Sequence, residues 1–309
     1  MLAIFLKTLP FFALIGLGWL AGRTRFFPPE ATAWLTKFVF YFALSAMLFR
    51  FASGLDLAAL WDGRFVMAYL TGSLLVWAIG FAAARWRGLP LSDAAMEAHC
   101  AMTGNTGFLG VPMLVVLLGP AAIGPVLMVL TIDMVVFSTL ITLLIHAARH
   151  GRVTAAMVLP MLRGLAGNPM IVSMLAGLGW AVLDLPMPGP LDEFLALLGG
   201  AATPGALFAI GAGLAGRAAQ RFGPALWLAG AKLILHPLAV AIAAFGIFRV
   251  EPVSAGIMVA AAALPVAGNV YILAQYFNVA AQRVSAAILI STAASIATVP
   301  LVIHWITKG

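Results

Sequence analysis

The sequence predicts an all-α polytopic membrane protein: ten transmembrane helices in two inverted five-helix repeats, with helices 4 and 9 broken. Three observations predict this fold: the composition, the number of long apolar segments, and two matched interruptions of such segments. Hydrophobic residues make up 63% of the 309 residues and charged residues only 9%, whereas a soluble domain carries about a quarter charged residues. The composition therefore excludes an ordinary soluble domain and predicts the lipid bilayer as the surroundings.

Ten apolar segments are long enough to span, because about 20 apolar residues cross the hydrocarbon core. We number them spans 1 to 10, and they are expected at residues 3–22, 32–51, 65–84, 94–118, 122–146, 167–184, 191–213, 224–248, 253–277 and 284–306. The first is interpreted as a retained helix and not as a signal peptide, because many further spans follow.

The distribution of Lys and Arg predicts the orientation. Eleven of these 17 residues lie on the side of the loops after odd-numbered spans, five lie on the other side, and Lys232 lies within a span. The positive-inside rule then places the odd loops, including the 147–166 connection, in the cytoplasm. We expect a protein integral to the plasma (inner) membrane, with both termini on the extracytoplasmic side. The pI of 10.2 does not indicate nucleic acid, because no basic stripe with interleaved aromatic residues is present.

The two halves of the chain resemble each other. The Gly-Leu-Gly-Trp sequence at 16–19 recurs at 177–180, and Met-Leu-Phe at 47–49 resembles Ala-Leu-Phe at 206–208. We therefore expect one five-helix repeat in 1–150 and a second in 151–309. Five is an odd number, so the second repeat enters the membrane from the opposite side, as in many secondary transporters.

Two short interruptions, at 102–112 and 264–271, are the most informative feature of the chain. Each breaks an apolar span with Gly and Pro, and each carries one Asn, at Asn105 and Asn269, 164 residues apart. Broken helices at matching places in two halves are typical of the substrate site of a secondary transporter. The candidate substrate-binding residues are Asn105, Asn269, Thr103, Gly104, Thr106, Gly268, Pro112, Pro265 and Tyr271.

Helix breaks of this kind suit an anion. The half-helices that begin after a break expose free N–H groups at the positive end of the helix dipole, and such ends bind carboxylates. The Asn side chains add donors and acceptors without burying a charge. The alternative is a plain Pro/Gly kink whose backbone groups bond to neighbouring helices.

Three further polar residues lie inside spans. Asp133 is near the centre of span 5, where burying a carboxylate costs free energy and therefore indicates a functional role. It is a candidate proton carrier or cation ligand, with Lys232 or a group of span 4 as partner. The alternative is a structural hydrogen bond between helices. Lys232 and His236, four residues apart on span 8, are further candidates for coupling or ion binding. Lys232 is expected to snorkel to the cytoplasmic interface.

The sequence offers no catalytic, metal or cofactor site. Cys100 is the only cysteine, so it cannot form an intrachain disulfide or a Cys-based metal site. Glu97 and His99 are two residues apart and do not share a helix face. No Walker loop, GxSxG elbow, HExxH motif or dinucleotide fingerprint is present.

The sequences GNTGFLGVPM at 104–113 and LPVAGNVYILAQYF at 264–277 resemble the signature segments of the auxin efflux carrier family, bacterial branch. The run at 10–25 and KLILHPL at 232–238 fit the same family, and the resemblance covers essentially the whole chain. Unlike the plant members, this chain has only a short loop between spans 5 and 6.

The resemblance implies two inverted repeats whose crossed fourth and ninth helices form the site. It implies transport of small organic anions, auxin in plants and malonate or other small carboxylates in bacterial relatives, and a homodimer. Asn105 and Asn269 match the crossover asparagines. Pro112 and Pro265 lie on opposite sides of these residues, so the internal symmetry is imperfect. Bile-acid carriers and sodium/proton antiporters share the general fold, so fold alone does not identify the substrate.

Three functions remain open from the sequence. The first is a secondary carrier of small organic anions working by alternating access, in which a bundle of spans 1, 2, 6 and 7 rocks against the rest. The second is a sodium- or proton-coupled carrier or antiporter with Asp133 as the ion site. The third, an intramembrane enzyme, lacks any catalytic pairing.

Overall fold

The computed structural model describes residues 2–55, 62–150, 158–216 and 222–308, and within these ranges the chain is helical without β-strands. The prediction of an all-α fold is confirmed. Residues 151–157, beside the expected boundary between the repeats, are outside the described ranges, as are Arg152, Arg217 and Arg221 of the charge count.

The helices, with π-helical and 3-10 turns written η, follow one another with short connections. In the first half they are α1 Leu2–Arg23, α2 Pro29–Phe38, η1 Val39–Ala43, α3 Leu44–Ser53, α5 Gly63–Trp86, α6 Leu91–Met102, η2 Thr106–Gly110, α7 Val111–Leu118, η3 Pro120–Ala122, α8 Ile123–Ile132, η4 Asp133–Phe137 and α9 Ser138–His150. In the second half they are α10 Val158–Ala166, α11 Pro169–Val182, α12 Gly189–Gly200, α13 Ala202–Ala215, α14 Phe222–Gly230, η6 Ala231–Leu235, α15 His236–Ala241, η7 Ile242–Ile247, α16 Pro252–Ala262, α17 Gly268–Tyr276 and α18 Ala281–Lys308.

Seven helical segments of the described chain are long and apolar enough to cross a membrane. They match predicted spans 1, 2, 3, 5, 7, 8 and 10. The three other predicted spans, 4, 6 and 9, correspond to shorter apolar helices, Thr106–Leu118, Pro169–Val182 and Pro252–Ala262. Spans 4 and 9 are short because each is divided by its break. The arrangement of ten helices as inverted repeats stays a prediction.

Local sequence explains where several helices begin. The side chains of Asp62 and Asn168 accept hydrogen bonds from the backbone two residues later, at the starts of α5 and α11. Glu251 caps α16 in the same way through Val253 N–H and Ser254 N–H. Such caps satisfy backbone donors that have no partner within the helix.

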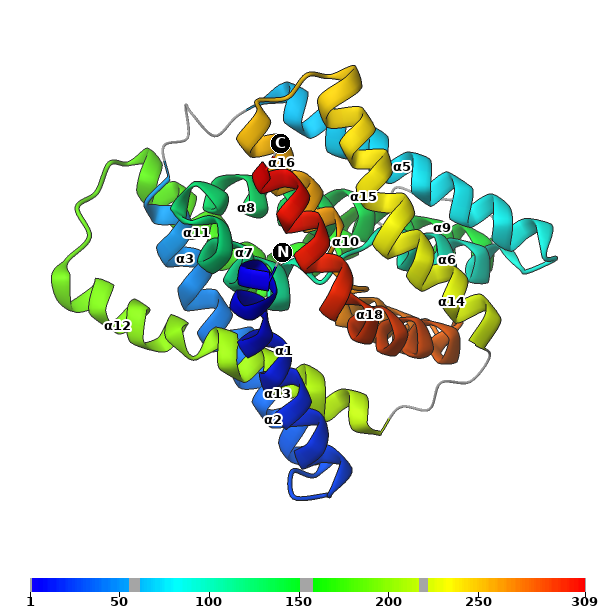
Figure 1. The fold of residues 1–309 in the computed structure, drawn as a ribbon, viewed down its shortest axis with the longest axis horizontal. Helices are drawn as coiled ribbons and strands as arrows, with labels where there is room; N and C mark the ends of the chain where they lie inside the picture. Colours follow the sequence, from blue (N-terminus) through cyan, green and yellow to red (C-terminus); the bar gives the residue numbers. More distant parts are fainter. Residues whose placement is uncertain (1, 56–61, 151–157, 217–221, 309) are drawn as a thin grey trace.

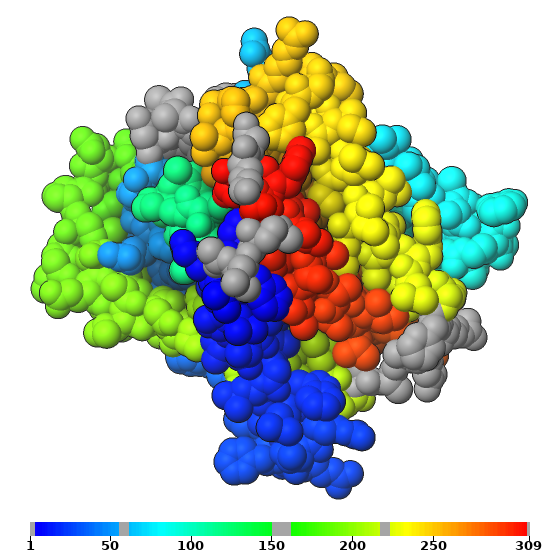
Figure 2. Space-filling model, viewed as in Figure 1, coloured from blue at the N-terminus to red at the C-terminus, as the bar shows by residue number. Residues whose placement is uncertain are grey.

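Two groups of helices are visible in Figure 1. Helices α1, α2, α3, α11, α12 and α13 gather at the lower left, and α5, α6, α9, α14, α15 and α18 lie on the right. Within the first group, α1 packs along α13, and α11 packs along α3. On the face shown in Figure 2, α1 and α18 lie side by side and connect the two groups.

Glycines let the helices of the first group approach closely. A Cβ on Gly18 would lie 2.1 Å from the Phe208 carbonyl oxygen, and a Cβ on Gly211 would lie 1.9 Å from that of Ile15. Small residues at such interfaces are typical of membrane helices, where close packing replaces the hydrophobic effect.

The core surrounds the two broken helices. Every residue of α6 from Ala94 to Met102 is buried, and so is every residue of α16 from Ala255 to Ala262. A helix that is buried on all sides lies inside the bundle. Both breaks therefore occur deep in the protein, where irregular backbone is tolerated.

Candidate functional site

The two breaks bond to each other through their main chains. The Asn105 N–H donates to the Pro265 carbonyl oxygen across 2.8 Å, and the Ala267 N–H donates to that of Thr103 across 3.1 Å. Gly104 and Val266 form an antiparallel bridge, the only sheet-like contact in the described chain. Proline and glycine interrupt the helical hydrogen bonds of each segment, and each break satisfies the groups that the other leaves open.

A short π-helical turn restarts the first broken helix. The Asn105 carbonyl accepts hydrogen bonds from Leu109 N–H and Gly110 N–H, at 3.1 and 2.9 Å, and η2 begins at Thr106. The second broken helix restarts as α17 at Gly268, so Asn269 lies in its first turn. Neither start has a side-chain cap, which leaves backbone donors at both.

The side-chain amides of the two asparagines are unused within the described chain. Asn105 is only 6% exposed, and its amide makes none of the side-chain hydrogen bonds of the described residues. Asn269 is half-buried, and its Oδ1 is a buried atom without a described partner. A Cβ on the adjacent Gly268 would meet nothing within 4 Å. Buried polar atoms are normally paired, so the unpaired Asn269 Oδ1 is an atom that a ligand could satisfy.

Asp133 is buried beside the first break. Its Oδ1 accepts a 2.8 Å hydrogen bond from the Tyr69 hydroxyl, and its Oδ2 is 3.5 Å from the Thr106 hydroxyl. The carboxylate is 4% exposed, as expected from the cost of a lipid-facing charge. The predicted partner from span 4 is therefore Thr106, and Tyr69 of α5 is a further partner that the sequence did not suggest.

The expectation that Lys232 snorkels to the interface is wrong. Its side chain is fully buried, and its ammonium donates to the Ala262 carbonyl oxygen at the end of α16. The break frees that carbonyl, because Val266 N–H bonds to the Ser291 hydroxyl at 3.1 Å instead of continuing the helix. The ion pairs of the described residues do not include one between this ammonium and Asp133, so the two opposite charges act on each other only at longer range.

Lys232 connects the break with the carboxylate. A Cβ on Gly104 would lie 3.3 Å from Cε and Nζ of Lys232. Gly104, which immediately precedes Asn105, therefore leaves room for the ammonium where the main chains of the two breaks bond to each other. We call this place the crossing point. A buried ammonium needs compensating partners: the Ala262 carbonyl accepts its hydrogen bond, and Asp133 contributes an opposite charge at longer range.

His236 extends the polar cluster along α5. Its Nε2 is 2.9 Å from the Ser73 hydroxyl, and its ring packs edge-on against Tyr69 with centroids 5.9 Å apart. Tyr69 and Ser73 are four residues apart and share one face of α5. The four-residue spacing of Tyr69 and Ser73 is the feature of the sequence that could have identified them. Tyr and Ser are both common in apolar helices, however, so this spacing does not single them out.

Three residues of the cluster lie in π-helical turns. Thr106 is in η2, Asp133 begins η4, and Lys232 is in η6. Single π turns within α-helices occur frequently at functional sites. Here they coincide with the polar residues that face one another.

The remaining candidate substrate-binding residues differ in how close they lie to the breaks. Thr103 is buried at the break, with its hydroxyl 3.3 Å from a ring nitrogen of His99. Pro112 is buried in the first turn of α7, beyond η2. Tyr271 is half-buried, and its hydroxyl accepts a 3.0 Å hydrogen bond from Gln275. The structure thus brings Thr103, Gly104, Asn105 and Pro265 together, and no contact described here brings Pro112 or Tyr271 to them.

Charged residues form a separate ion-pair cluster at the start of α6. Asp93 pairs with Arg283 of α18, and the fully buried Glu97 pairs with both Arg87 and Arg283. The cluster fixes the beginning of the first broken helix to α18. It gives Glu97 a structural role that the sequence did not indicate.

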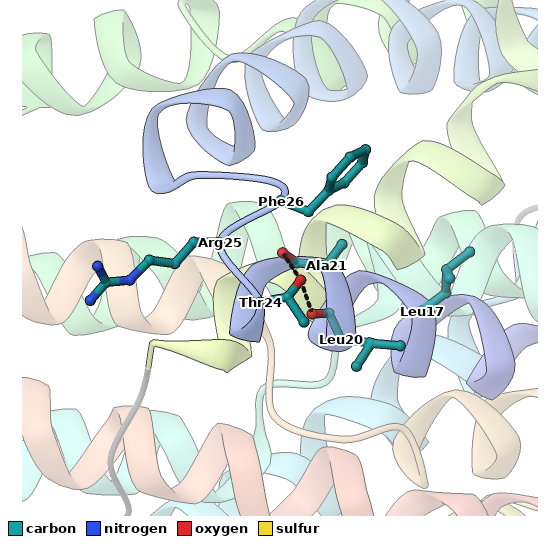
Figure 3. Close-up of a pocket in the computed structure, with 6 residues that line it drawn as sticks. All are labelled: Leu17, Leu20, Ala21, Thr24, Arg25 and Phe26. Carbon is teal, nitrogen blue, oxygen red and sulfur yellow. Dashed lines mark hydrogen bonds between the residues drawn. The ribbon is translucent and has the colours of Figure 1, made fainter.

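The other features of the described residues do not overlap the breaks. The described residues contain no group of three or more His, Cys, Asp or Glu side chains that could hold a metal ion. A cavity of about 610 Å³ lies at the end of α1, lined by Leu17, Leu20, Ala21, Thr24, Arg25 and Phe26. Figure 3 shows Arg25 extending away from the apolar residues of this cavity.

The chain is similar to known membrane transport proteins. The family model described as "Membrane transport protein" matches residues 3–303. A protein of Rhizobium meliloti (strain 1021), named "Putative malonate transporter", is 33% identical over 304 residues, which cover 97% of this chain and 95% of that protein. The resemblance to auxin efflux carriers is thereby confirmed.

Proposed function

Because the chain belongs to the membrane transport protein family, we propose that it is a secondary carrier of small organic anions, which bind where spans 4 and 9 break. The family and the transporter-named relative indicate an integral membrane transporter and not an enzyme. One observation carries the proposal: the main-chain bonds between Asn105 and Pro265 and between Ala267 and Thr103 join both breaks at one place.

The chemistry of the crossing point suits a carboxylate. Two uncapped helix starts supply backbone donors, and the amides of Asn105 and Asn269 supply side-chain donors. The Lys232 ammonium adds a positive charge beside Gly104. The relative's name suggests malonate, and a small dicarboxylate is the substrate class that we propose.

The packing of the helices supports the inverted repeat. If spans 1 to 5 correspond to spans 6 to 10, the contact of α1 with α13 becomes that of α11 with α3, and both occur. The contact of α5 with α6 likewise becomes that of α15 with α16, which is also present. A contact map that maps onto itself under this exchange is what the repeat requires.

Alternating access follows from the same arrangement. The group of α1 to α3 and α11 to α13 is one body, and the helices that hold the two breaks form the other. Motion of one body against the other would expose the crossing point first to one side of the membrane and then to the other.

The alternative is coupling to sodium or a proton at Asp133. Its support is the buried cluster of Asp133, Tyr69, Thr106 and Lys232. If Asp133 bound a proton, Lys232 would lose its counter-charge and would attract an anion more strongly. Coupling and anion transport are then two functions of one site.

Uptake of radiolabelled malonate into liposomes containing the purified protein tests the proposal. We expect saturable uptake that is lost in the Asn105→Ala/Asn269→Ala variant and retained when the exposed Ile272, on the same helix as Asn269, is changed to Ala. Small carboxylates that bind the folded protein should raise its melting temperature, and at equal concentration those with lower dissociation constants should raise it more. If no carboxylate is transported and none raises the melting temperature, the proposed substrate class is wrong.

The proposal also includes the membrane in which the protein lies, its orientation there and its oligomeric state. We place the protein in the plasma (inner) membrane with both termini extracytoplasmic, on the basis of the Lys and Arg distribution. A homodimer is proposed from the family resemblance alone.

A further inference from the structure

A second cavity of the described chain is lined by residues outside both breaks. It has a volume of about 550 Å³ and is lined by the end of α3, by η3 and the start of α8, and by the connection from α11 to α12. Small-molecule sites fall in the range of about 300–1,000 Å³. These three lining segments follow predicted spans 2, 4 and 6. Even-numbered spans all end on the same side of the membrane, so the segments lie at one end of the helices.

Arg50 and Asp192 are the charged residues of this cavity. Arg50 Nε donates to Asp192 Oδ1 at 2.6 Å, and Nη2 donates to Oδ2 at 3.1 Å. The two side chains remain 39% and 41% exposed. A guanidinium has five N–H groups, so three remain for a second anion while Asp192 holds Arg50 in place.

The walls of the cavity favour an anion on Arg50. Trp180, Phe51, Ile123 and Leu185 contribute apolar surface, which lowers the local dielectric constant and strengthens the attraction to a charge. The Trp180 indole N–H is already bonded to the Leu185 carbonyl at 2.9 Å. Arg50 is therefore the principal donor in the wall.

We propose that this cavity is an outer docking site, in which Arg50 binds one carboxylate of the anion before it reaches the crossing point. Asp192 is a positioning residue that holds the guanidinium and keeps docking weak enough for the anion to leave. The identity of the anion rests on the proposed function. The docking site itself does not depend on transport.

Protection of an introduced cysteine tests the site on the purified protein in detergent. Ser53 lines the cavity, and its hydroxyl bonds back to the Arg50 carbonyl at 3.0 Å. In a Cys100→Ser background, Ser53→Cys is labelled with a cationic methanethiosulfonate, with malonate or with sodium chloride at equal ionic strength. Thr24→Cys is the matched control, because Thr24 also lines a cavity and bonds back to helix carbonyls.

We expect malonate to slow labelling at Ser53→Cys in a saturable way and to leave Thr24→Cys unaffected. Arg50→Gln should raise the half-protecting malonate concentration about 10-fold or more, as for loss of a hydrogen bond to a charged group. Asp192→Asn, which keeps Arg50, should lower that concentration; it decides the matter if Arg50→Gln does not fold. Equal protection by chloride, or protection unchanged by both variants, overturns the docking site.

A further variant separates this inference from the proposed function. In Asn105→Ala/Asn269→Ala, protection of Ser53→Cys should persist although binding at the crossing point is lost. Protection without any malonate uptake would support the docking site and contradict the carrier. Protection that disappears in the double Asn variant would assign the effect to the crossing point and overturn the docking site.

Discussion

The backbone N–H of Asn105 donates to the Pro265 carbonyl oxygen across 2.8 Å, although the two residues belong to opposite halves of the chain. Neither break can satisfy its own backbone, so each depends on the other. The two breaks therefore form one structural unit, and we propose that a ligand bound there contacts both asparagines. This relationship is the basis of the first prediction.

Asn105→Ala and Asn269→Ala should each weaken malonate binding about 10- to 100-fold, because a hydrogen bond to a charged group is worth about 1.5–3 kcal/mol. Folding should be retained, since Gly and Pro set the breaks. The two changes should be non-additive, as for groups that share one ligand. Dissociation constants of both single variants and the double variant check this. Near-normal affinity in both folded single variants would place the site elsewhere.

Asp133→Asn should abolish the pH dependence of transport while leaving malonate binding measurable, because the amide cannot carry a proton. Uptake at a series of pH values in liposomes checks this, with Tyr69→Phe as a companion that removes the 2.8 Å bond but keeps the carboxylate. Tyr69→Phe should shift the pH profile without flattening it. An unchanged profile in Asp133→Asn would exclude the coupling role.

Lys232→Met should destabilise the protein more than the double variant Lys232→Met/Asp133→Asn does. Removing one of two buried opposite charges leaves the other less compensated. Because these two form no direct ion pair, the cost should be below that of breaking a buried salt bridge, about 3–5 kcal/mol. Melting temperatures of the two singles and the double form a cycle, and we expect a coupling energy of about 0.5–3 kcal/mol. Lys7→Met, at an exposed position, is the control. Additive effects of the two changes would mean that the charges do not interact.

The sequence was sufficient to predict the breaks and some of the residues around them, but not Tyr69, Ser73 or the position of Lys232. Gly and Pro act on their own segment, so the interruptions beside Asn105 and Asn269 could be recognised locally. The cost of a buried carboxylate likewise predicted the interior position of Asp133. The contacts of Tyr69 and Ser73 depend on how α5 faces α15 and η4, which no periodicity encodes. Lys232 was misjudged because its acceptor, the Ala262 carbonyl, is free only as a consequence of the distant break.

Gly211→Ala should destabilise the protein, and Gly213→Ala on the same helix should not. A Cβ at Gly211 would lie 1.9 Å from the Ile15 carbonyl oxygen, whereas one at Gly213 would meet nothing within 4 Å. Overpacking that forces backbone shifts costs about 1–3 kcal/mol. Thermal unfolding in detergent compares the two variants. Equal melting temperatures would contradict the close packing of α1 on α13.

The orientation is tested with single cysteines in a Cys100→Ser background. The charge count predicts that the α1–α2 turn is cytoplasmic and that the α11–α12 connection is extracytoplasmic. Phe26 and Leu185 are suitable positions, because both are exposed, at 85% and 46%. Phe26 belongs to the connection between α1 and α2, which projects at the lower edge of Figure 1. A membrane-impermeant maleimide added to intact cells should label Leu185→Cys and not Phe26→Cys, and permeabilised cells should show labelling of both. The reverse pattern in intact cells would invert the topology and place the Arg50 cavity on the cytoplasmic side, where it would receive anions on their way out of the cell.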